Sequence, residues 1–317
     1  MKHLNLAMHA ERYAGLRKAL GFKFRFEYSL LHQFVRFLES QDAPEPIRAA
    51  MALQWAVSAS PRCGRCGQVT RLNTARHFLI YLKAFLPATE IPPSGMLAEE
   101  RRPTPYLYSD EQIVRMQQTT RTLWNPGCLK QITFETLIGL LASTGLRIGE
   151  ALRLTLRDVH LDLTDPPHLE IRNTKFGKSR LVPVHPSTAW NLRLYLDERH
   201  RIVGGKPEAL FLLRPNKPLL YSVALHYFEQ IIVVVGVPKN PSRRGPAWHS
   251  LRHTFAVRRL LTWYRAGADV RSLLPHLAVY LGHLSLIQTY HYLTATPELL
   301  SAAASMFEGY ADPGGDQ

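Results

Sequence analysis

The segment Thr-Gly-Leu-Arg-Ile-Gly-Glu at residues 144–150 could place a cation in a cleft. Arg147 follows a glycine at the expected start of a helix, and Glu150 lies three residues further on. A guanidinium in this position can direct a planar set of N–H donors at an anion, while a carboxylate at i+3 holds it in place. Taken alone, the segment is explained equally well by an ordinary Arg–Glu pair on the surface.

A second segment, His-Ser-Leu-Arg-His at residues 249–253, combines a proton-transfer group with a second cation. His249 and Arg252 are three residues apart and therefore share one face of a helix. His249 and His253 also have the i, i+4 spacing of a zinc-binding helix. However, the segment lacks the glutamate of H-E-x-x-H, and Arg252 would repel a metal ion from nearly the same face. We therefore expect no metal site.

A third segment supplies tyrosines, because Leu-Gly-His at residues 281–283 is followed by Tyr-His-Tyr at residues 290–292. A tyrosine hydroxyl, with an ordinary pKa of about 10, attacks a phosphodiester only when strong positive charge lies beside it. The two arginines would supply that charge. Taken singly, each tyrosine fits a packing role and His283 fits a histidine at a helix end. The combination favours a phosphoryl-transfer site.

The order of these motifs resembles that of the tyrosine recombinases, the phage-integrase family. The resemblance covers residues 144–293 in motif form, and the helical segment before them resembles the core-binding domain of the family. It also implies a lysine in a hairpin, for which Lys175 is the better match and Lys178 the alternative. The site residues implied by the resemblance are Arg147, Lys175, His249, Arg252, His283 and Tyr292.

The resemblance implies a site-specific recombinase or integrase that cuts and rejoins DNA through a 3′-phosphotyrosyl intermediate. Tyr292 would attack the scissile phosphate, Lys175 would protonate the departing 5′ oxygen, and His249 would help to move the tyrosine proton. His283 would bond a phosphate oxygen, and Glu150 would orient supporting groups. No metal, cofactor or ATP is expected. A type IB topoisomerase and an inactive, regulatory DNA-binding relative are the alternatives.

The resemblance also implies partners. We expect the chain to bind double-stranded DNA and to form a homo-oligomer, a tetramer on paired sites, with accessory recombination proteins as possible further partners. Residues 294–300 are similar to transposon-borne members of the family, so integration, excision and transposition all remain open as biological roles.

Helices must position these residues. Apolar residues recur at helical spacing over residues 4–20, 28–38, 47–57 and 72–86, which predicts a four-helix domain over residues 1–86. This stretch contains thirteen Lys and Arg against five Asp and Glu, a net charge of +8, which favours contact with DNA phosphates. Residues 87–105 are rich in proline and charge and have no apolar period, which predicts a linker.

The catalytic domain is expected over residues 106–317, with a C-terminal helix and a tail at its end. Its first helix should begin at Ser109, residues 134–143 read as a buried helix, and residues 152–159 continue the helical pattern. A β-hairpin is predicted at residues 168–174 and 180–184, and the remainder is mostly helical. The predicted fold is mainly α with a small β-sheet: a helical core-binding domain followed by a mixed α+β catalytic domain.

Composition limits the classes of protein that fit. The 317 residues carry a net charge of +14 with 46% hydrophobic residues, which is typical of a globular protein with a polyanionic partner. Three cysteines are too few for a disulfide scaffold, and no apolar run is long enough to span a membrane. We therefore expect a soluble protein in the reducing cytoplasm, without membrane association.

Overall fold

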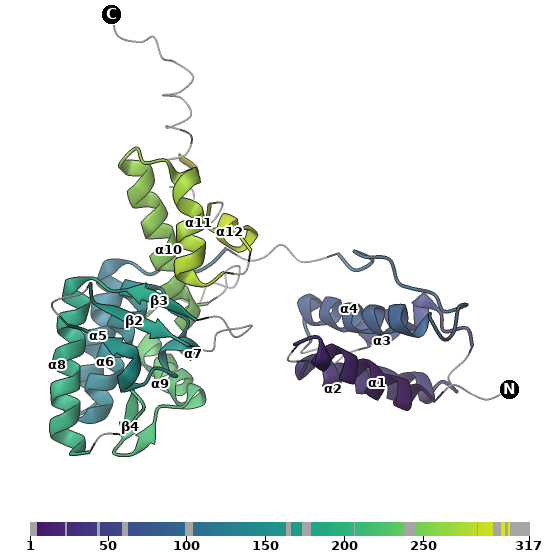
Figure 1. Cartoon of the computed structure of the whole chain (residues 1–317), viewed down its shortest axis with the longest axis horizontal. Helices are drawn as coiled ribbons and strands as arrows, with labels where there is room; N and C mark the ends of the chain where they lie inside the picture. Colours follow the sequence, from purple (N-terminus) through teal and green to yellow (C-terminus); the bar gives the residue numbers. More distant parts are fainter. Residues whose placement is uncertain are drawn as a thin grey trace, which may run out of the picture. The chain divides into compact units, whose positions relative to one another are not determined.

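Two compact units, Met1–Arg102 and Pro103–Gln317, make up the chain. Figure 1 shows the helices of both units and the sheets of the second unit. The computed structural model describes residues 5–22, 24–42, 45–58, 63–98, 104–162, 166–172, 179–205, 207–237, 245–283, 285–293, 299–301 and 304.

The first unit is built from helices around one apolar core. Its helices are α1 (Leu6–Ala19), α2 (Phe26–Glu39), α3 (Ala49–Val57) and α4 (Arg65–Leu82). The apolar residues that predicted these helices form the core, in which Leu31, Phe34, Leu38, Phe78, Leu79 and Leu82 are fully buried. Helix α4 begins at Arg65 and not at Leu72, because Gly64 already takes the N-cap position.

Part of the segment at residues 87–105 packs on this helical unit. Leu97 belongs to the apolar core of the unit, and Thr89 is buried. The backbone N–H of Glu90 donates to the Ile47 carbonyl at 2.9 Å, and Arg76 Nε donates to the Pro92 carbonyl at 2.9 Å. The segment has no apolar period because its described part forms no regular helix or strand. Single residues of it nevertheless pack against the helical unit.

The second unit is mainly helical, which confirms the predicted fold class. Helix α6 runs through its centre and packs against α5, α8 and α10. Helices α10, α11 and α12 lie side by side (Figure 1). The helices are α5 (Asp110–Leu123), α6 (Leu129–Thr144), α7 (Ile148–Ala151), α8 (Pro186–Val203), α9 (Tyr221–Val235), α10 (Trp248–Arg265), α11 (Val270–Leu281) and α12 (Ile287–Leu293).

A three-stranded antiparallel sheet covers one part of this unit in the order β1-β2-β3. Its strands are β1 (Val159–His160), β2 (His168–Ile171) and β3 (Arg180–Pro183). Leu169 on β2 lies opposite Val182 on β3, and both are fully buried. The predicted hairpin strands are therefore present, whereas residues 173–178, which include Lys175, lie outside the described residues.

Two sequence-based expectations for this unit are wrong. Residues 152–159 are not helical: α7 ends at Ala151, and a 3₁₀ turn, η1 (Leu156–Asp158), leads into β1. Asp158 closes this turn by accepting hydrogen bonds from the backbone N–H and the hydroxyl of Thr155, at 2.8 and 2.7 Å. A second sheet was also missed. Its strands, β4 (Leu212–Arg214) and β5 (Lys217–Pro218), are too short to show alternation.

Across the described parts of both units, no helix has the length and apolarity that crossing a membrane requires.

Candidate active site

The turn between α6 and α7 places Arg147 and requires a glycine. Gly145 ends α6 with a φ of 63°, and a Cβ at this position would lie 2.5 Å from Cδ1 of the Phe255 ring on α10. Both the left-handed backbone and the close approach of the ring therefore need glycine. Arg147 then adopts an extended conformation, and its backbone N–H donates to Glu150 Oε2 at 3.1 Å.

Three arginine side chains meet at the C-terminal end of α11. Carbonyls at a helix end have no partner within the helix and carry partial negative charge, so they offset the repulsion between guanidinium groups. Three successive carbonyls are used in this way. Arg180 Nε donates to the carbonyl of Tyr280 at 2.8 Å, Arg252 Nη2 to that of Leu281 at 2.7 Å, and Arg147 Nη2 to that of Gly282 at 3.2 Å.

Arg252 is the most buried of the three, with only 1% of its surface exposed. Its Nη1 donates to the Gly145 carbonyl at 2.9 Å, so this one guanidinium joins the end of α6 to the end of α11. Burial, followed by the positive charge of Arg147, lowers the pKa of Arg252 to about 10. Arg252 therefore remains charged at neutral pH and contributes a fixed positive charge to the site.

A buried carboxylate, Glu150, lies between two of the arginines. Glu150 Oε1 accepts from Arg147 Nη1 at 2.9 Å, and Arg180 binds both oxygens through Nη2 at 2.9 Å and Nη1 at 3.3 Å. Burial alone would raise the pKa of Glu150. The hydrogen bond and charge of Arg180, together with those of Arg147, outweigh it and lower the pKa to about 2. Glu150 is therefore ionised at neutral pH.

Tyr292 on α12 lies beside this arginine cluster and is 4% exposed. Its ring stacks on His283 at 5.9 Å between centroids and meets His253 edge-on at 5.5 Å. His253 in turn contacts His249 at 4.5 Å between ring centroids. The side chain of Tyr290, by contrast, is 48% exposed. The two tyrosines are two positions apart, about 200° around a helix, which explains why only one of them faces inward.

The arginines determine the electrostatics of the neighbouring rings. Burial raises the pKa of Tyr292, while the nearby charges and hydrogen bonding of Arg252 and the charge of Arg147 oppose that rise. Burial and the charges of Arg252 and Arg147 lower the pKa of His283 to about 3, so this histidine is neutral at pH 7. His283 Nδ1 lies 2.8 Å from the hydroxyl of Thr289, which is itself buried.

The structure thus brings Arg147, Arg252, His283 and Tyr292 into one cluster, with His249 at its exposed edge next to His253. Lys175 and its alternative Lys178 lie outside the described residues. Within the part of the chain that the structure describes, no group of three His, Cys, Asp or Glu side chains could hold a metal ion.

Sequence reasoning missed Arg180, which occupies the first position of β3. Its side chain is 10% exposed and contacts Glu150 and α11. The alternation of side chains along β3 could have indicated Arg180, because side chains two positions apart share one face of a strand. Arg180 is therefore on the same face as Val182, which is fully buried, so an inward-facing charge could have been predicted.

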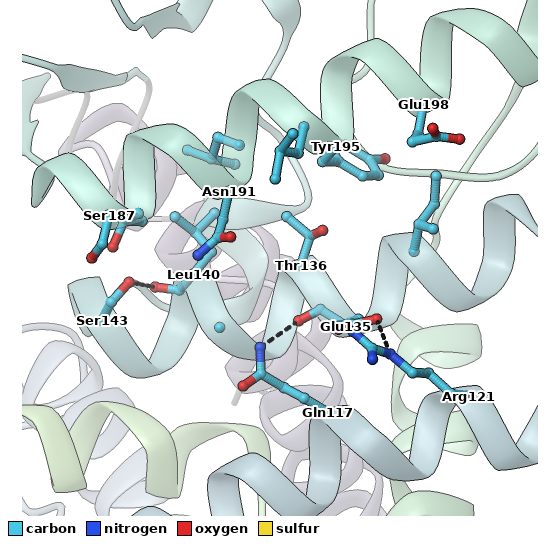
Figure 2. A pocket seen from close by; sticks show the side chains of 15 residues that line it. Gln117, Arg121, Glu135, Thr136, Leu140, Ser143, Ser187, Asn191, Tyr195 and Glu198 are labelled. Atoms are coloured by element: carbon cyan, nitrogen blue, oxygen red, sulfur yellow. Dashed lines mark hydrogen bonds and ion pairs between the residues drawn. The ribbon is translucent and has the colours of Figure 1, made fainter. Parts of the chain in front are cut away.

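A cavity among the described residues lies elsewhere and is lined by none of these residues. It has a volume of about 440 Å³ and lies between α5, α6 and α8, and Figure 2 shows its polar lining. Glu135 on α6 pairs with Arg121 on α5, and Gln117 donates to the Glu135 carbonyl at 3.2 Å. Nothing in this lining resembles the arginine cluster.

Comparison with known proteins identifies the family. Residues 108–298 match the phage integrase family. The chain is 38% identical over 304 residues to y4rB of Sinorhizobium fredii, a protein named as an integrase/recombinase, and the match covers 94% of this chain and 95% of the relative. XerD of Corynebacterium glutamicum, named as a tyrosine recombinase, is 33% identical over 165 residues, which are 52% of this chain and 49% of the relative.

Solved structures share the fold. The XerH site-specific recombinase in a post-cleavage complex with its difH substrate superposes with a TM-score of 0.65 at 20% identity, covering 88% of this chain and 78% of that chain. The Tn1549 transposon integrase in complex with a circular intermediate DNA gives a TM-score of 0.63 at 16% identity, covering 94% and 99%. With the family match and the relative that spans nearly its whole length, the chain belongs to the phage integrase family, whose members are the tyrosine recombinases.

Proposed function

We propose that this chain is a site-specific DNA recombinase that cleaves and rejoins strands through a 3′-phosphotyrosyl intermediate, without metal or ATP. The observation that carries this proposal is the position of Tyr292, a buried tyrosine beside the fixed cation Arg252 and the neutral His283. A buried tyrosine needs a nearby cation to form its phenolate, and the same cations can stabilise a phosphate in transition.

In the proposed cleavage step, Tyr292 Oη attacks the scissile phosphorus and displaces the 5′ oxygen of the next nucleotide. The P–O5′ bond breaks as the new P–O bond forms, and the tyrosine proton leaves by way of His249. The 5′ oxygen takes a proton and becomes a hydroxyl. Arg147 and Arg252 would stabilise the negative charge on the nonbridging oxygens, and this guanidinium chemistry requires no metal.

Two further roles follow from the motif pattern. Lys175 would give its proton to the departing 5′ oxygen, because the family pattern puts a lysine in this hairpin. Neutral His283 would donate a hydrogen bond to a phosphate oxygen. Such a donor requires a proton on Nε2, and that tautomer is favoured when the Thr289 hydroxyl donates to Nδ1, 2.8 Å away. The phosphotyrosyl bond retains the energy of the phosphodiester, so a 5′ hydroxyl from another strand can reverse the step.

The partners are also proposals. The net charge of +8 over residues 1–86 favours binding of the helical unit to DNA phosphates. Solved relatives include a λ integrase dimer on a core site and a λ integrase tetramer on a Holliday junction. We propose that this chain likewise binds duplex DNA and assembles as a tetramer on paired sites.

Covalent trapping tests the proposal and finds the target site. The full chain is incubated with fragmented genomic DNA from the organism that carries its gene and then denatured with detergent, and the DNA that remains attached to protein is sequenced. We expect recurrent adducts joined through a 3′ phosphate, with a new 5′ end that polynucleotide kinase labels directly because it is a hydroxyl. Exchange of strands between two duplexes then separates a recombinase from a topoisomerase. A 5′-linked adduct, or no adduct, would contradict the proposal.

A further inference from the structure

Arg180 on β3 lies within the cluster, but it is not one of the residues to which the proposed mechanism gives a role. We propose that Arg180 is a positioning residue for strand cleavage, which holds Arg147 in its working orientation through Glu150. The inference rests on the proposed function, because it concerns the rate of the cleavage step.

Protein groups occupy all three nitrogen atoms of the Arg180 guanidinium. Nη2 and Nη1 donate to the two oxygens of Glu150, and Nε donates to the Tyr280 carbonyl. The side chain is 10% exposed, whereas that of Arg147 is 36% exposed. Arg147 is therefore available to a ligand in solution, and Arg180 is already committed to the protein. Between Arg147 and Arg180, this difference in exposure favours phosphate contact by Arg147 and support by Arg180. Arg252 is buried as well, but its side chain bonds Tyr292, the proposed nucleophile.

Arg180 contacts both structures that hold Arg147. Among the described residues, the Arg147 side chain is held by Glu150 and by the carbonyls of Leu281 and Gly282 at the end of α11. Arg180 binds the first of these partners through its paired hydrogen bonds to Glu150. It binds the second through the Tyr280 carbonyl, one residue before Leu281.

The contact at Gly282 is close enough to exclude a side chain. A Cβ at this position would lie 2.7 Å from Arg180 Nη1 and 2.9 Å from its Cζ, and Gly282 also has a φ of 68°. The guanidinium therefore packs against the backbone of the residue that accepts from Arg147 and precedes His283. Loss of Arg180 would leave space at this end of α11 and free the Glu150 carboxylate to move.

The charged groups around Glu150 support the same role for Arg180. Glu150 is faced by Arg147 at the start of α7, by Arg180 from β3 and by Arg252 from α10. Without Arg180, a buried carboxylate that now makes four hydrogen bonds to arginine groups would keep only the two from Arg147. The carboxylate would then be free to shift, which misplaces Arg147, and it would take up a proton at a higher pH than in the wild type. The protonated form loses its ionic pair with Arg147, so Arg147 is oriented still less well toward the phosphate as the pH falls.

The test compares Arg180→Gln and Arg180→Lys with the wild type on a nicked duplex that carries a recovered target site. Single-turnover adduct formation is measured at saturating DNA, along with DNA affinity and thermal stability. Arg201→Gln is the matched control, because Arg201 pairs with Glu198 on the exposed surface of α8. We expect Arg180→Gln to cleave about 100-fold more slowly, as a misplaced catalytic group does, with DNA affinity changed less than about threefold. Arg180→Lys should recover part of the rate.

Three further measurements separate positioning from a general loss of structure. The rate of Arg180→Gln relative to wild type should fall as the pH is lowered from 7 to 5, because losing a cation raises the pKa of Glu150. In the Glu150→Gln background, Arg180→Gln should have less than about a twofold effect, since the two residues act as one unit. A substrate with a 5′-bridging sulfur has a leaving group that needs little protonation, and it should not restore the rate, because the defect concerns phosphate stabilisation.

The inference is wrong if a folded Arg180→Gln cleaves at the wild-type rate, or if its rate relative to wild type does not change with pH. It is also wrong if the rate losses caused by Arg180→Gln and Glu150→Gln multiply in the double variant, or if the sulfur substrate restores cleavage. Should Arg180→Gln fail to fold, the same criteria apply to Arg180→Lys. Failure of the proposed function is distinguishable, because the wild-type chain would then form no adduct at all.

Discussion

Replacing Arg252 by lysine tests whether the site needs the planar guanidinium group of Arg252, and not merely its buried positive charge. Arg252 is 1% exposed and donates to the carbonyls of Gly145 and Leu281, which belong to different helices. A lysine retains the positive charge but has a single ammonium group on a flexible chain. Its single nitrogen would have to replace the two nitrogens that now reach carbonyls on different helices, so we expect one of these two bonds to be lost.

The expected magnitude follows from these two bonds. A buried carbonyl left without a partner costs about 1–3 kcal/mol, so we expect the free energy of unfolding to fall by about 2 kcal/mol. For a unit of this size, that corresponds to a decrease of about 4–8 °C in Tm. Cleavage should fall further, by about 100- to 1000-fold, because one preorganised donor to the phosphate is lost as well.

The assay pairs thermal unfolding with single-turnover adduct formation on a nicked duplex, at a temperature where the variant is folded. Arg258→Lys is the control on the same helix, since Arg258 is partly exposed and pairs with Asp110. It should cleave at nearly the wild-type rate. If Arg252→Lys cleaves at a rate within about threefold of wild type, the guanidinium geometry of Arg252 does not stabilise the transition state. If its Tm is unchanged, the two carbonyl bonds do not stabilise the junction between α6 and α11.

Three other perturbations test separate parts of the site. Thr289→Val removes the hydroxyl next to His283 and should slow cleavage several-fold, whereas Thr289→Ser keeps it and should not. Equal rates for the two variants would show that this hydroxyl does not keep the proton of His283 on Nε2. Gly145→Ala should lower the free energy of unfolding by more than about 2 kcal/mol, because backbone strain and the Phe255 ring both oppose a Cβ. Gly204→Ala is its control, since φ is 68° there but nothing lies within 4 Å, and an equal loss would contradict the role of the ring. Excess EDTA should leave adduct formation intact. If EDTA abolished the adduct and magnesium restored it, the proposal that arginine side chains stabilise the phosphate without a metal would be wrong.

The long helices could be predicted from the sequence because their apolar residues recur with a regular period. The site residues Arg147, Arg252, His283 and Tyr292 were implied by the resemblance to the tyrosine recombinases, and the structure places them close together. The choice of Tyr292 over Tyr290 as the proposed nucleophile came from the resemblance to the family. Its burial and the exposure of Tyr290 agree with that choice.

Other features could not be predicted, because no side-chain pattern encodes them. The carbonyls that accept hydrogen bonds from the arginines at the end of α11 are present in every residue type, so their use depends on tertiary structure alone. The bond between Arg180 and Glu150 joins residues thirty positions apart, whereas the local pair with Arg147 was visible. The strands β4 and β5 are too short for their period to appear.

Adduct formation by Tyr292→Phe and Tyr290→Phe tests the central claim most directly. The duplex is a nicked target site, and noncovalent binding is measured in parallel by gel shift. Tyr292→Phe removes the one oxygen proposed to attack and keeps the buried ring, so we expect no covalent complex and near-normal DNA binding. Tyr290→Phe alters an exposed side chain and should form the adduct at the wild-type rate. A covalent complex from Tyr292→Phe, together with its loss in Tyr290→Phe, would contradict the placement of the nucleophile and the site built around it.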